Sequence, residues 1–394
     1  MSRKNKIRNR VTYQSEAIYV SKEITSTVSG DHIQLDRIQN ANYNFTIRRT
    51  NINQYSRLSS IDSIVIESPT VNLDFSYYLT DGFNEKALGF YVQDETNTQE
   101  ANFTSGHLIS SSGKNVFITT AAEGVDAQGE VGNDIESVIG IGNAYLSNYG
   151  LELAVGNVPM VSVSMECANI NSTTAPEITG DTAITGIATP AINVSDGIQL
   201  SGSVELKPAT SGSSSITVLR PGDVTVNIEN FNGQTISNLS GADAINIQSA
   251  SLSIPLSRSA IQRIGSKFPF ARTVDLPATA TLSINAIATD LTARNLANVI
   301  NDSDKKNVIL TLKDSNSITK MIYTLKNCVL VSESFTSSIG SNKSVDLVFS
   351  TQIGGPNDQI NGVFVSGNSN TNLPISWNGI LNDWQESNST WDSL

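Results

Sequence analysis

Residues with the chemistry of catalysts or metal ligands are few and scattered in this sequence. The two histidines, His32 and His107, have no neighbouring cysteine or second histidine, and the two cysteines, Cys167 and Cys328, share neither zinc-site nor disulfide-framework spacing. A Ser–His–Asp triad is not ruled out by the sequence, because the fold can bring together residues that are far apart in the chain. However, the sequence contains no nucleophile-elbow motif that would support such a triad. There is also no glycine-rich phosphate loop of the Walker type. The sequence therefore predicts a protein that is not an enzyme and that has no cofactor and no metal site.

The composition indicates which type of secondary structure dominates the chain. Hydrophobic residues make up 39% of the 394 residues and charged residues only 16%. Serine, threonine, asparagine and glycine are abundant. Because β-branched side chains pack well on a pleated surface, this balance predicts a mainly β chain of two or three domains.

The net charge of −12 argues against a protein that clamps nucleic acid, because neutralising phosphates requires lysine and arginine. The charge is compatible with a surface along which DNA slides without being held. No apolar segment typical of a secretion signal follows the basic residues 1–10, and no stretch approaches the length of a membrane span. We therefore expect synthesis in a cytoplasm and no membrane partner.

One pattern of residues occurs twice in the chain. The segment IQNANYNFTIRRTNI, which starts at Ile38, aligns with IQSASLSIPLSRSAI, which starts at Ile247, at an offset of 209. A later block aligns at an offset of 184, so that Asn143 meets Asn327. Apolar and polar residues alternate with a period of two in these blocks, which is typical of strands with one face on a core and the other in water.

The repeat predicts an all-β fold of two tandem domains, each with one short helix. The change of offset implies 25 extra residues in copy one, between about Gly82 and Gly142, which we expect to form outward ornaments. The helices are predicted at Thr292–Asn301 and, in copy one, near Asn84–Phe90. The predicted divisions are a basic N-terminal arm (1–10), copy one (11–170), a connector rich in threonine, alanine and glycine (171–219), copy two (220–354) and a polar C-terminal arm (355–394).

Two parts of the repeat resemble the tail tube proteins of long-tailed bacteriophages. The run YNFTIRRTNINQYSRLSSIDSIVIESPTVNLDFSYYL, from Tyr43 to Leu79, is similar to the first long hairpin of that family. YGLELAVGNVPMVSVSME, from Tyr149 to Glu166, and SVDLVFSTQIGGPND in copy two resemble a later strand pair. The resemblance implies a β-sandwich with a flanking helix, whose inner sheet joins those of its neighbours into a barrel. In the family, stacked rings of six such domains form a tube, and DNA passes along its lumen.

The duplication sets this chain apart from family members with a single tube domain. Since each chain supplies two domains, we expect homotrimeric rings with pseudo-sixfold symmetry. The resemblance implies further partners: other tail proteins such as a terminator, a baseplate or tip or a sheath, and DNA that passes non-specifically through the lumen. The implied location is the tail of the virion, after assembly in the host cytoplasm.

The polar positions of the predicted strands form one face, and the resemblance implies that this face lines the lumen. Asparagine, serine and threonine would present neutral hydrogen-bonding groups there, and Asp74, Glu166 and Asp346 would add negative charge. The predicted lumen-facing residues are Asn40, Asn42, Asn44, Asn72, Asp74, Ser76, Ser162, Ser164, Glu166, Ser249, Ser251, Ser253, Thr281, Ser283, Asn285 and Asp346.

The hairpin connectors of both copies are locally basic. Residues 48–60 and residues 257–272 contain arginine but no acid. One interpretation is a solvated loop, and the other is contact with an acidic surface of the adjacent ring. Recurrence in both copies favours the contact. The predicted ring–ring contacts are Arg48, Arg49, Arg57, Arg258, Arg263 and Lys267.

All three tryptophans, Trp377, Trp384 and Trp391, lie in the C-terminal arm at spacings of seven. The polar residues around them are compatible with a disordered tail, but tryptophan is enriched where proteins meet. We predict an arm that docks on a neighbouring subunit or another tail protein.

The sequence thus favours a structural subunit of a bacteriophage tail tube. The alternative is a tandem β-sandwich of the carbohydrate-binding or adhesin-like kind. Such modules tend to present aromatic platforms on their loops, whereas tryptophan here is confined to one tail. A β-rich hydrolase is disfavoured by the lack of an acid/base or nucleophile motif.

Overall fold

The alternating segments of the sequence form the strands of a computed structural model. It describes residues 16–94, 101–109, 113–122, 127, 135–174, 176–179, 183–207, 219, 224–231, 234–237, 246–287, 305–314, 316–337, 344–355 and 358–367. The fold is all-β, as predicted, with two short helices among the described residues. In that part of the chain no helix is long and apolar enough to cross a membrane.

The strands of copy one are β1 (Glu16–Ser21), β2 (His32–Gln34), β3 (Ile38–Thr46), β4 (Arg49–Ile52), β5 (Asp62–Val65), β6 (Thr70–Tyr78), β7 (Gln93–Asp94), β8 (Lys114–Ala121), β9 (Ile135–Ala154), β10 (Met160–Cys167) and β11 (Asn169–Thr174). A 3₁₀ turn (Ser29–Asp31) and the helices α1 (Phe83–Leu88) and α2 (Ser105–Ile109) lie between them.

The connector contains β12 (Glu177–Thr179), β13 (Ala183–Ala188) and β14 (Ser203–Leu206). The strands of copy two are β15 (Val224–Phe231), β16 (Gln234–Ser237), β17 (Asn246–Pro255), β18 (Arg258–Ile261), β19 (Ala271–Val274), β20 (Ala278–Ile287), β21 (Lys306–Lys313), β22 (Thr319–Thr336), β23 (Ser344–Ile353) and β24 (Gly362–Gly367).

One antiparallel sheet, the central sheet, runs through both copies in the order β3–β6–β10–β9–β17–β20–β23–β22. An outer sheet of β2, β1, β8, β9 and β11 covers its copy-one half. A second outer sheet of β16, β15, β21, β22, β24 and β7 covers its copy-two half. Apolar side chains from both copies form one continuous core between these layers.

The strands of the two copies correspond as the alignment of their sequences predicts. β4 and β5 match β18 and β19, with Arg49 opposite Arg258 in the alignment. β9 and β10 match β22 and β23, and the first residue of β9, Ile135, aligns with the first residue of β22, Thr319. β8 and β21 correspond at a third offset between these two, so the extra residues of copy one form two insertions, one before β8 and one between β8 and β9. The same order of strands with the same antiparallel partners therefore occurs twice.

The long strands β9 and β22 each pass from an outer sheet into the central sheet. Asn143 and Asn327 lie at corresponding points along them and have left-handed φ angles of 53° and 54°. The buried side chain of Asn143 accepts a hydrogen bond from the Ile192 N–H (2.9 Å) and donates one to the Ile192 carbonyl (3.3 Å). Asparagine tolerates the left-handed region better than most residues, so it suits this bend.

Replacing Asn143 with alanine is expected to lower the free energy of unfolding by about 2–3 kcal/mol, because the bend becomes strained and two buried backbone groups lose their partner. Urea unfolding is the measurement. Asn143→Gly is the control, since glycine keeps the left-handed conformation and loses only the hydrogen bonds. An Asn143→Ala chain within about 0.5 kcal/mol of the wild type would contradict this account.

The structured parts of both copies continue past the predicted boundaries at residues 170 and 354. β11 reaches Thr174 and pairs with β9, and β24 ends at Gly367 and pairs with β22. The polar composition of β11 hid this strand, which adds mainly backbone hydrogen bonds to β9. β24 instead buries Val363 and Val365 in the core, although it lies in the segment predicted as a polar arm. The predicted short helix near Asn84–Phe90 is α1, whereas Thr292–Asn301 lies outside the described residues.

The described part of the connector forms a layer that covers the first outer sheet. β12, β13 and β14 form a three-stranded sheet. Ile184, Ile187 and Val204 from this sheet pack with Tyr19 and Phe117 of the first outer sheet in a second hydrophobic cluster. Burial of these side chains explains why a segment rich in small residues still contains isoleucine and valine.

The first insertion of copy one lies against copy two, which corrects the expectation of outward ornaments. β7 pairs in parallel with β24, matching Gln93 with Ser366. The Phe103 N–H donates to the Val363 carbonyl at 2.8 Å, and the Asn102 amide donates to two carbonyls of the 358–361 turn. The insertion thus joins the two copies within one chain.

Candidate functional site: the polar sheet face and its open edges

The polar face of the central sheet is the surface opposite the core. All sixteen predicted lumen-facing residues belong to it, because cross-strand partners lie on the same face. One row, for example, runs from Asn42 through Asp74 and Ser164 to Asn148. Ser76 is the one buried member that was predicted for this face.

The charge on this face is one-sided. Its described strand positions include four acids, Asp74, Glu152, Glu166 and Asp346, and neither lysine nor arginine. Neutral groups lie between the acids, such as the Asn72 amide, which donates to the Asn44 side chain at 3.2 Å. A polyanion on this face would meet hydrogen-bonding groups and weak repulsion, but no fixed cation from the strands.

The two halves of the central sheet meet at one junction, where β9 pairs with β17. Leu151 lies opposite Leu252, and Tyr149 lies opposite Ile254. The Leu256 N–H also donates to the Ser147 carbonyl at 2.8 Å. Leu252 and Ile254 are 2% and 0% exposed, so the apolar side of the junction is fully covered.

Among the described residues, the central sheet ends in two open edges, β3 and the C-terminal half of β22. In the alignment of the two copies, β3 corresponds to β17 and β22 corresponds to β9, and β17 and β9 are the two strands that pair at the junction. Their apolar side chains are exposed: Tyr43 42% and Phe45 57% on β3, and Val331 63% and Phe335 54% on β22. Monomeric proteins usually blunt such edges, so exposed apolar edge strands mark a pairing surface.

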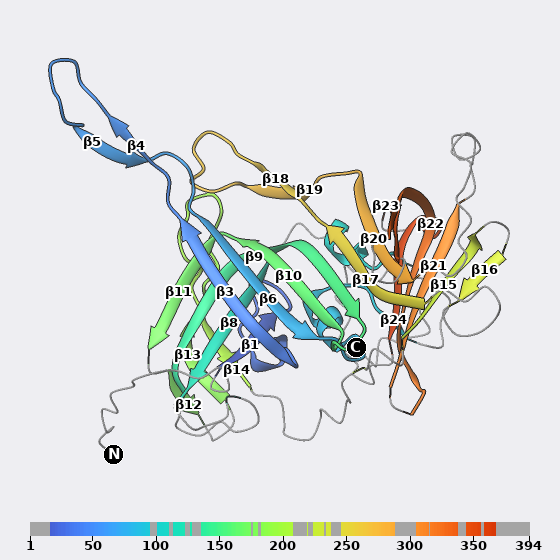
Figure 1. Cartoon of the computed structure of the whole chain (residues 1–394). Helices are drawn as coiled ribbons and strands as arrows, with labels where there is room; N and C mark the ends of the chain where they lie inside the picture. Colours follow the sequence, from blue (N-terminus) through green and yellow to red (C-terminus); the bar gives the residue numbers. More distant parts are fainter. Residues whose placement is uncertain are drawn as a thin grey trace, which may run out of the picture.

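Two hairpins extend from the same end of the central sheet (Figure 1). β4–β5 points away from the body, and its tip residues Tyr55 and Leu58 are fully exposed. The other hairpin, β18–β19, leads from β17 into β20.

The predicted ring–ring residues have different surroundings. Arg258 donates to the carbonyls of Leu146 (3.4 Å), Arg272 (3.0 Å) and His107 (3.1 Å), so its guanidinium is occupied within the chain. The prediction of a ring–ring contact does not fit Arg258. The sequence concealed this, because the acceptors are backbone carbonyls far away in the chain.

The other predicted ring–ring residues are exposed. Arg263 donates to the Ser195 hydroxyl at 3.1 Å, and Arg48 lies 3.5 Å from Glu67. Arg49, Arg57 and Lys267 also lie on the two hairpins.

Arg272 belongs to the basic connector 257–272, but it was not among the predicted ring–ring contacts. Its guanidinium binds Glu166 at 2.8 Å, and its side chain is 10% exposed. Arg258 and Arg272 both lie over the Tyr145 ring, 5.4 and 5.8 Å from its centroid. Glu166, predicted to add negative charge to the lumen, therefore forms an ion pair at the hairpin end of the polar face.

A buried polar cluster also joins the copies. The Tyr77 and Tyr149 hydroxyls donate to Glu85 Oε1 at 2.9 and 3.3 Å. The Tyr149 hydroxyl lies 2.9 Å from that of Tyr323 in copy two. Burial raises the pKa of Glu85 to about 7, against the hydrogen bonds from the tyrosines, which lower it.

The residues considered for chemistry are buried. Burial lowers the pKa of His107 to about 3, and the positive charges of Arg258 and Lys114 lower it further. Burial raises the pKa of the Cys167 and Cys328 thiols to about 12. Among the described residues, no three histidine, cysteine or acidic side chains group as a metal site.

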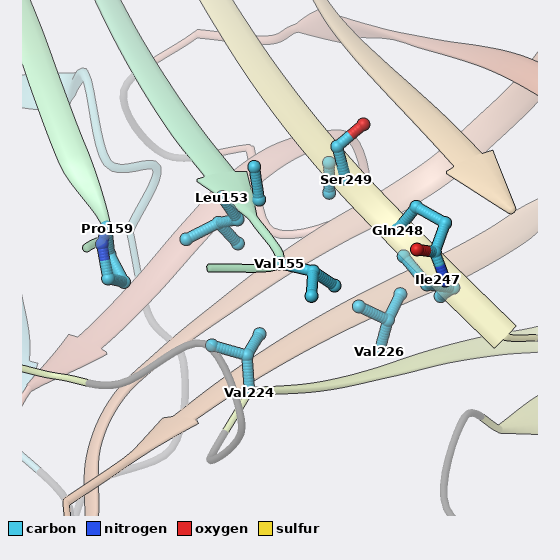
Figure 2. Close-up of a pocket in the computed structure, with 10 residues that line it drawn as sticks. Leu153, Val155, Pro159, Val224, Val226, Ile247, Gln248 and Ser249 are labelled. Atoms are coloured by element: carbon cyan, nitrogen blue, oxygen red, sulfur yellow. The ribbon is translucent and has the colours of Figure 1, made fainter. Parts of the chain in front are cut away.

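A small hollow of about 60 Å³ lies at the end of the junction opposite the hairpins. Leu153, Val155 and Pro159 of copy one and Val224 and Val226 of copy two surround it (Figure 2). Ligand pockets usually measure about 300–1,000 Å³, so the hollow is a packing gap at the junction.

The predicted arms lie outside the described residues. This holds for the basic residues 1–10 and for Trp377, Trp384 and Trp391. Their docking stays a prediction.

Comparison of the sequence with known protein families and with curated proteins finds no match. Among solved structures, one similar chain comes from the cryo-EM structure of the anti-feeding prophage (AFP) baseplate, 6-fold symmetrised. The two are 14% identical, with a TM-score of 0.24, over 37% of this chain and 93% of that chain. At this TM-score the likeness carries no argument about function.

Proposed function

We propose that this protein is the structural subunit of a bacteriophage tail tube. Chains join side by side through the open edges of their central sheets, and the polar face lines a channel for DNA. The observation that carries the proposal is the pairing of β9 with β17, which joins two copies of one domain edge to edge and leaves the same two kinds of edge open.

The repeat predicts the register between chains. Leu252 and Leu151 are partners at the internal junction, and their counterparts are Tyr43 and Phe335. Ser253 and Gly150 correspond in the same way to Asn44 and Ser334. Pairing β3 of one chain with β22 of the next would cover the exposed aromatic side chains that the single chain leaves in water.

Each contact is head to tail, and repetition of such a contact forms a ring when the rotation between neighbouring domains closes. The proposal requires that three chains complete this rotation. Three chains would bring roughly 24 strands to the barrel, a number at which barrels enclose a wide lumen. A channel lined by acids and neutral groups suits passage of DNA without retention. Stacked rings would form the tube in the virion tail, with terminator and baseplate proteins as further partners.

Cysteine pairs test the register between chains. Tyr43→Cys with Phe335→Cys, and Asn44→Cys with Ser334→Cys, are expected to form disulfides between chains on mild oxidation. Two successive pairs are needed because only every second pair of an antiparallel ladder has closely spaced side chains. The largest covalent species on a denaturing gel should be a trimer, and electron microscopy should show rings or hollow tubes.

The mixed pair, Tyr43→Cys with Ser334→Cys, is the control, because its side chains would point to opposite faces. A dimer linked through Tyr43→Cys alone would indicate symmetric β3–β3 pairing and contradict the proposal. So would a protein that remains monomeric at all concentrations.

The alternative function is an adhesin-like or carbohydrate-binding virion protein. It predicts isolated chains that bind glycans, with no rings. Glycan-array binding by a monomer would favour it.

A further inference from the structure

The hairpin β18–β19 of copy two contacts copy one across the junction between the copies. At its base, Arg258 donates to the carbonyls of Leu146 and His107 in copy one. Arg272 on the second strand binds Glu166 of copy one at 2.8 Å. This hairpin therefore stabilises the edge-to-edge pairing with side-chain contacts across the same junction.

We propose that the hairpin β4–β5 makes the corresponding contact on copy two of a second chain. The repeat identifies the residues involved. Arg49 corresponds to Arg258. The Leu146 carbonyl, which accepts from Arg258, corresponds to the carbonyl of Leu330 in β22. This inference rests on the lateral junction of the proposed function and gives the hairpin a role within a ring, in place of the predicted contact between rings.

The surface that would receive β4–β5 is apolar where its internal counterpart is ionic. Tyr145, which lies under Arg258, corresponds to Val329, and both Val329 and Val331 are more than half exposed. The hairpin presents Ile64 and Val65, each exposed by more than 40%. The counterpart of Val65 is Val274, which packs partly buried against the core.

The ion pair of the internal contact has no equivalent at this second site. Arg272 corresponds to Ser63 of β5, and Glu166 corresponds to Ser350 of β23. The contact between chains thus depends on apolar burial and on the Arg49 guanidinium, which donates to a backbone carbonyl. A second copy of this chain fits the surface, because it alone brings the hairpin in the register set by β3 and β22.

The missing ion pair provides a gain-of-function test. Ser63→Arg with Ser350→Glu transfers the Arg272–Glu166 pair to the contact between chains. The concentration at which rings dissociate is expected to fall about tenfold at low salt, as expected for a partly buried charge pair. The gain should disappear in about 1 M salt, where charges are screened within roughly 3 Å. Ser63→Arg with Ser350→Arg is the matched control and should raise the dissociation concentration.

Loss-of-function variants test the arginine. Arg49→Ala should raise the ring dissociation concentration about fivefold, Arg49→Lys less, and Thr50→Ala, at the neighbouring position, should leave it unchanged. If all these variants have the same ring dissociation concentration and the Tyr43→Cys/Phe335→Cys crosslink still forms, the proposed hairpin contact is wrong but the lateral assembly is not. Failure of that crosslink in an otherwise unaltered chain would overturn the lateral assembly and the hairpin contact with it.

Discussion

Replacing Tyr43 and Phe45 together with lysine is expected to leave the chain folded and to abolish its assembly. In the single chain both side chains are about half exposed, so lysine can reach water. At the proposed junction they would occupy the positions of Leu252 and Ile254, which are 2% and 0% exposed. Burial of two ammonium groups without partners costs several kcal/mol, which corresponds to a loss of at least about a hundredfold in the association constant.

The control adds the same charge to the same strand. Asn42→Lys with Asn44→Lys changes the polar face, where the new side chains stay in water. Sedimentation should show monomers for the Tyr43/Phe45 variant and rings for the Asn42/Asn44 variant, with similar thermal unfolding for both. Equal loss of assembly in the two variants would indicate a general effect of charge, and rings in both would refute the proposed pairing of β3.

Replacing Glu85 with glutamine is expected to change the dependence of stability on pH. The pKa of Glu85 is raised to about 7 in the folded chain, first by burial, from an ordinary value near 4.5. A carboxyl with a raised pKa favours folding in its protonated form. Its contribution is therefore complete below about pH 4.5, declines as the pH rises to about 7 and stays lost above that.

The difference in pKa corresponds to about 3 kcal/mol. Glutamine stays neutral and still accepts the hydrogen bond from the Tyr77 hydroxyl. Glu85→Gln should therefore be more stable than the wild type by roughly this amount at pH 8, and close to it at pH 4.5.

Urea unfolding at both pH values measures the effect. Glu67→Gln, which alters an exposed carboxyl on the β4–β5 hairpin, is the control and should change stability by less than about 0.5 kcal/mol. A Glu85→Gln chain that loses stability at pH 8 would mean that the ionised carboxylate stabilises the cluster of Tyr77, Tyr149 and Tyr323.

Local patterns in the sequence determined the strands and which of their faces is buried. Alternation of Ala250, Leu252 and Ile254 with serines predicts a strand with one apolar face, and β17 has these three side chains in the core. The left-handed Asn143 and Asn327 are matched with each other in the alignment of the two copies. Period and turn chemistry act over a few residues, so they can be seen in the sequence.

The tertiary structure decided which strands became neighbours. Tyr43 and Phe45 follow the same pattern as Leu252 and Ile254, yet one pair is exposed and the other buried. The difference arises because the chain places β9 beside β17 and leaves β3 at the edge of the sheet. Sheet pairing between distant segments depends on backbone hydrogen bonds that most residues can make, so the sequence pattern carries little information about it.

The same reason applies to the contacts across the junction. Arg258 meets backbone carbonyls, and Arg272 meets an acid 106 residues away, so neither contact leaves a local pattern in the sequence. The basic composition of the hairpins was visible, but its role depends on which surface lies beneath each hairpin. For β18–β19 that surface is formed only when the two copies pair edge to edge, and in the contact that we propose for β4–β5 a second chain would supply it.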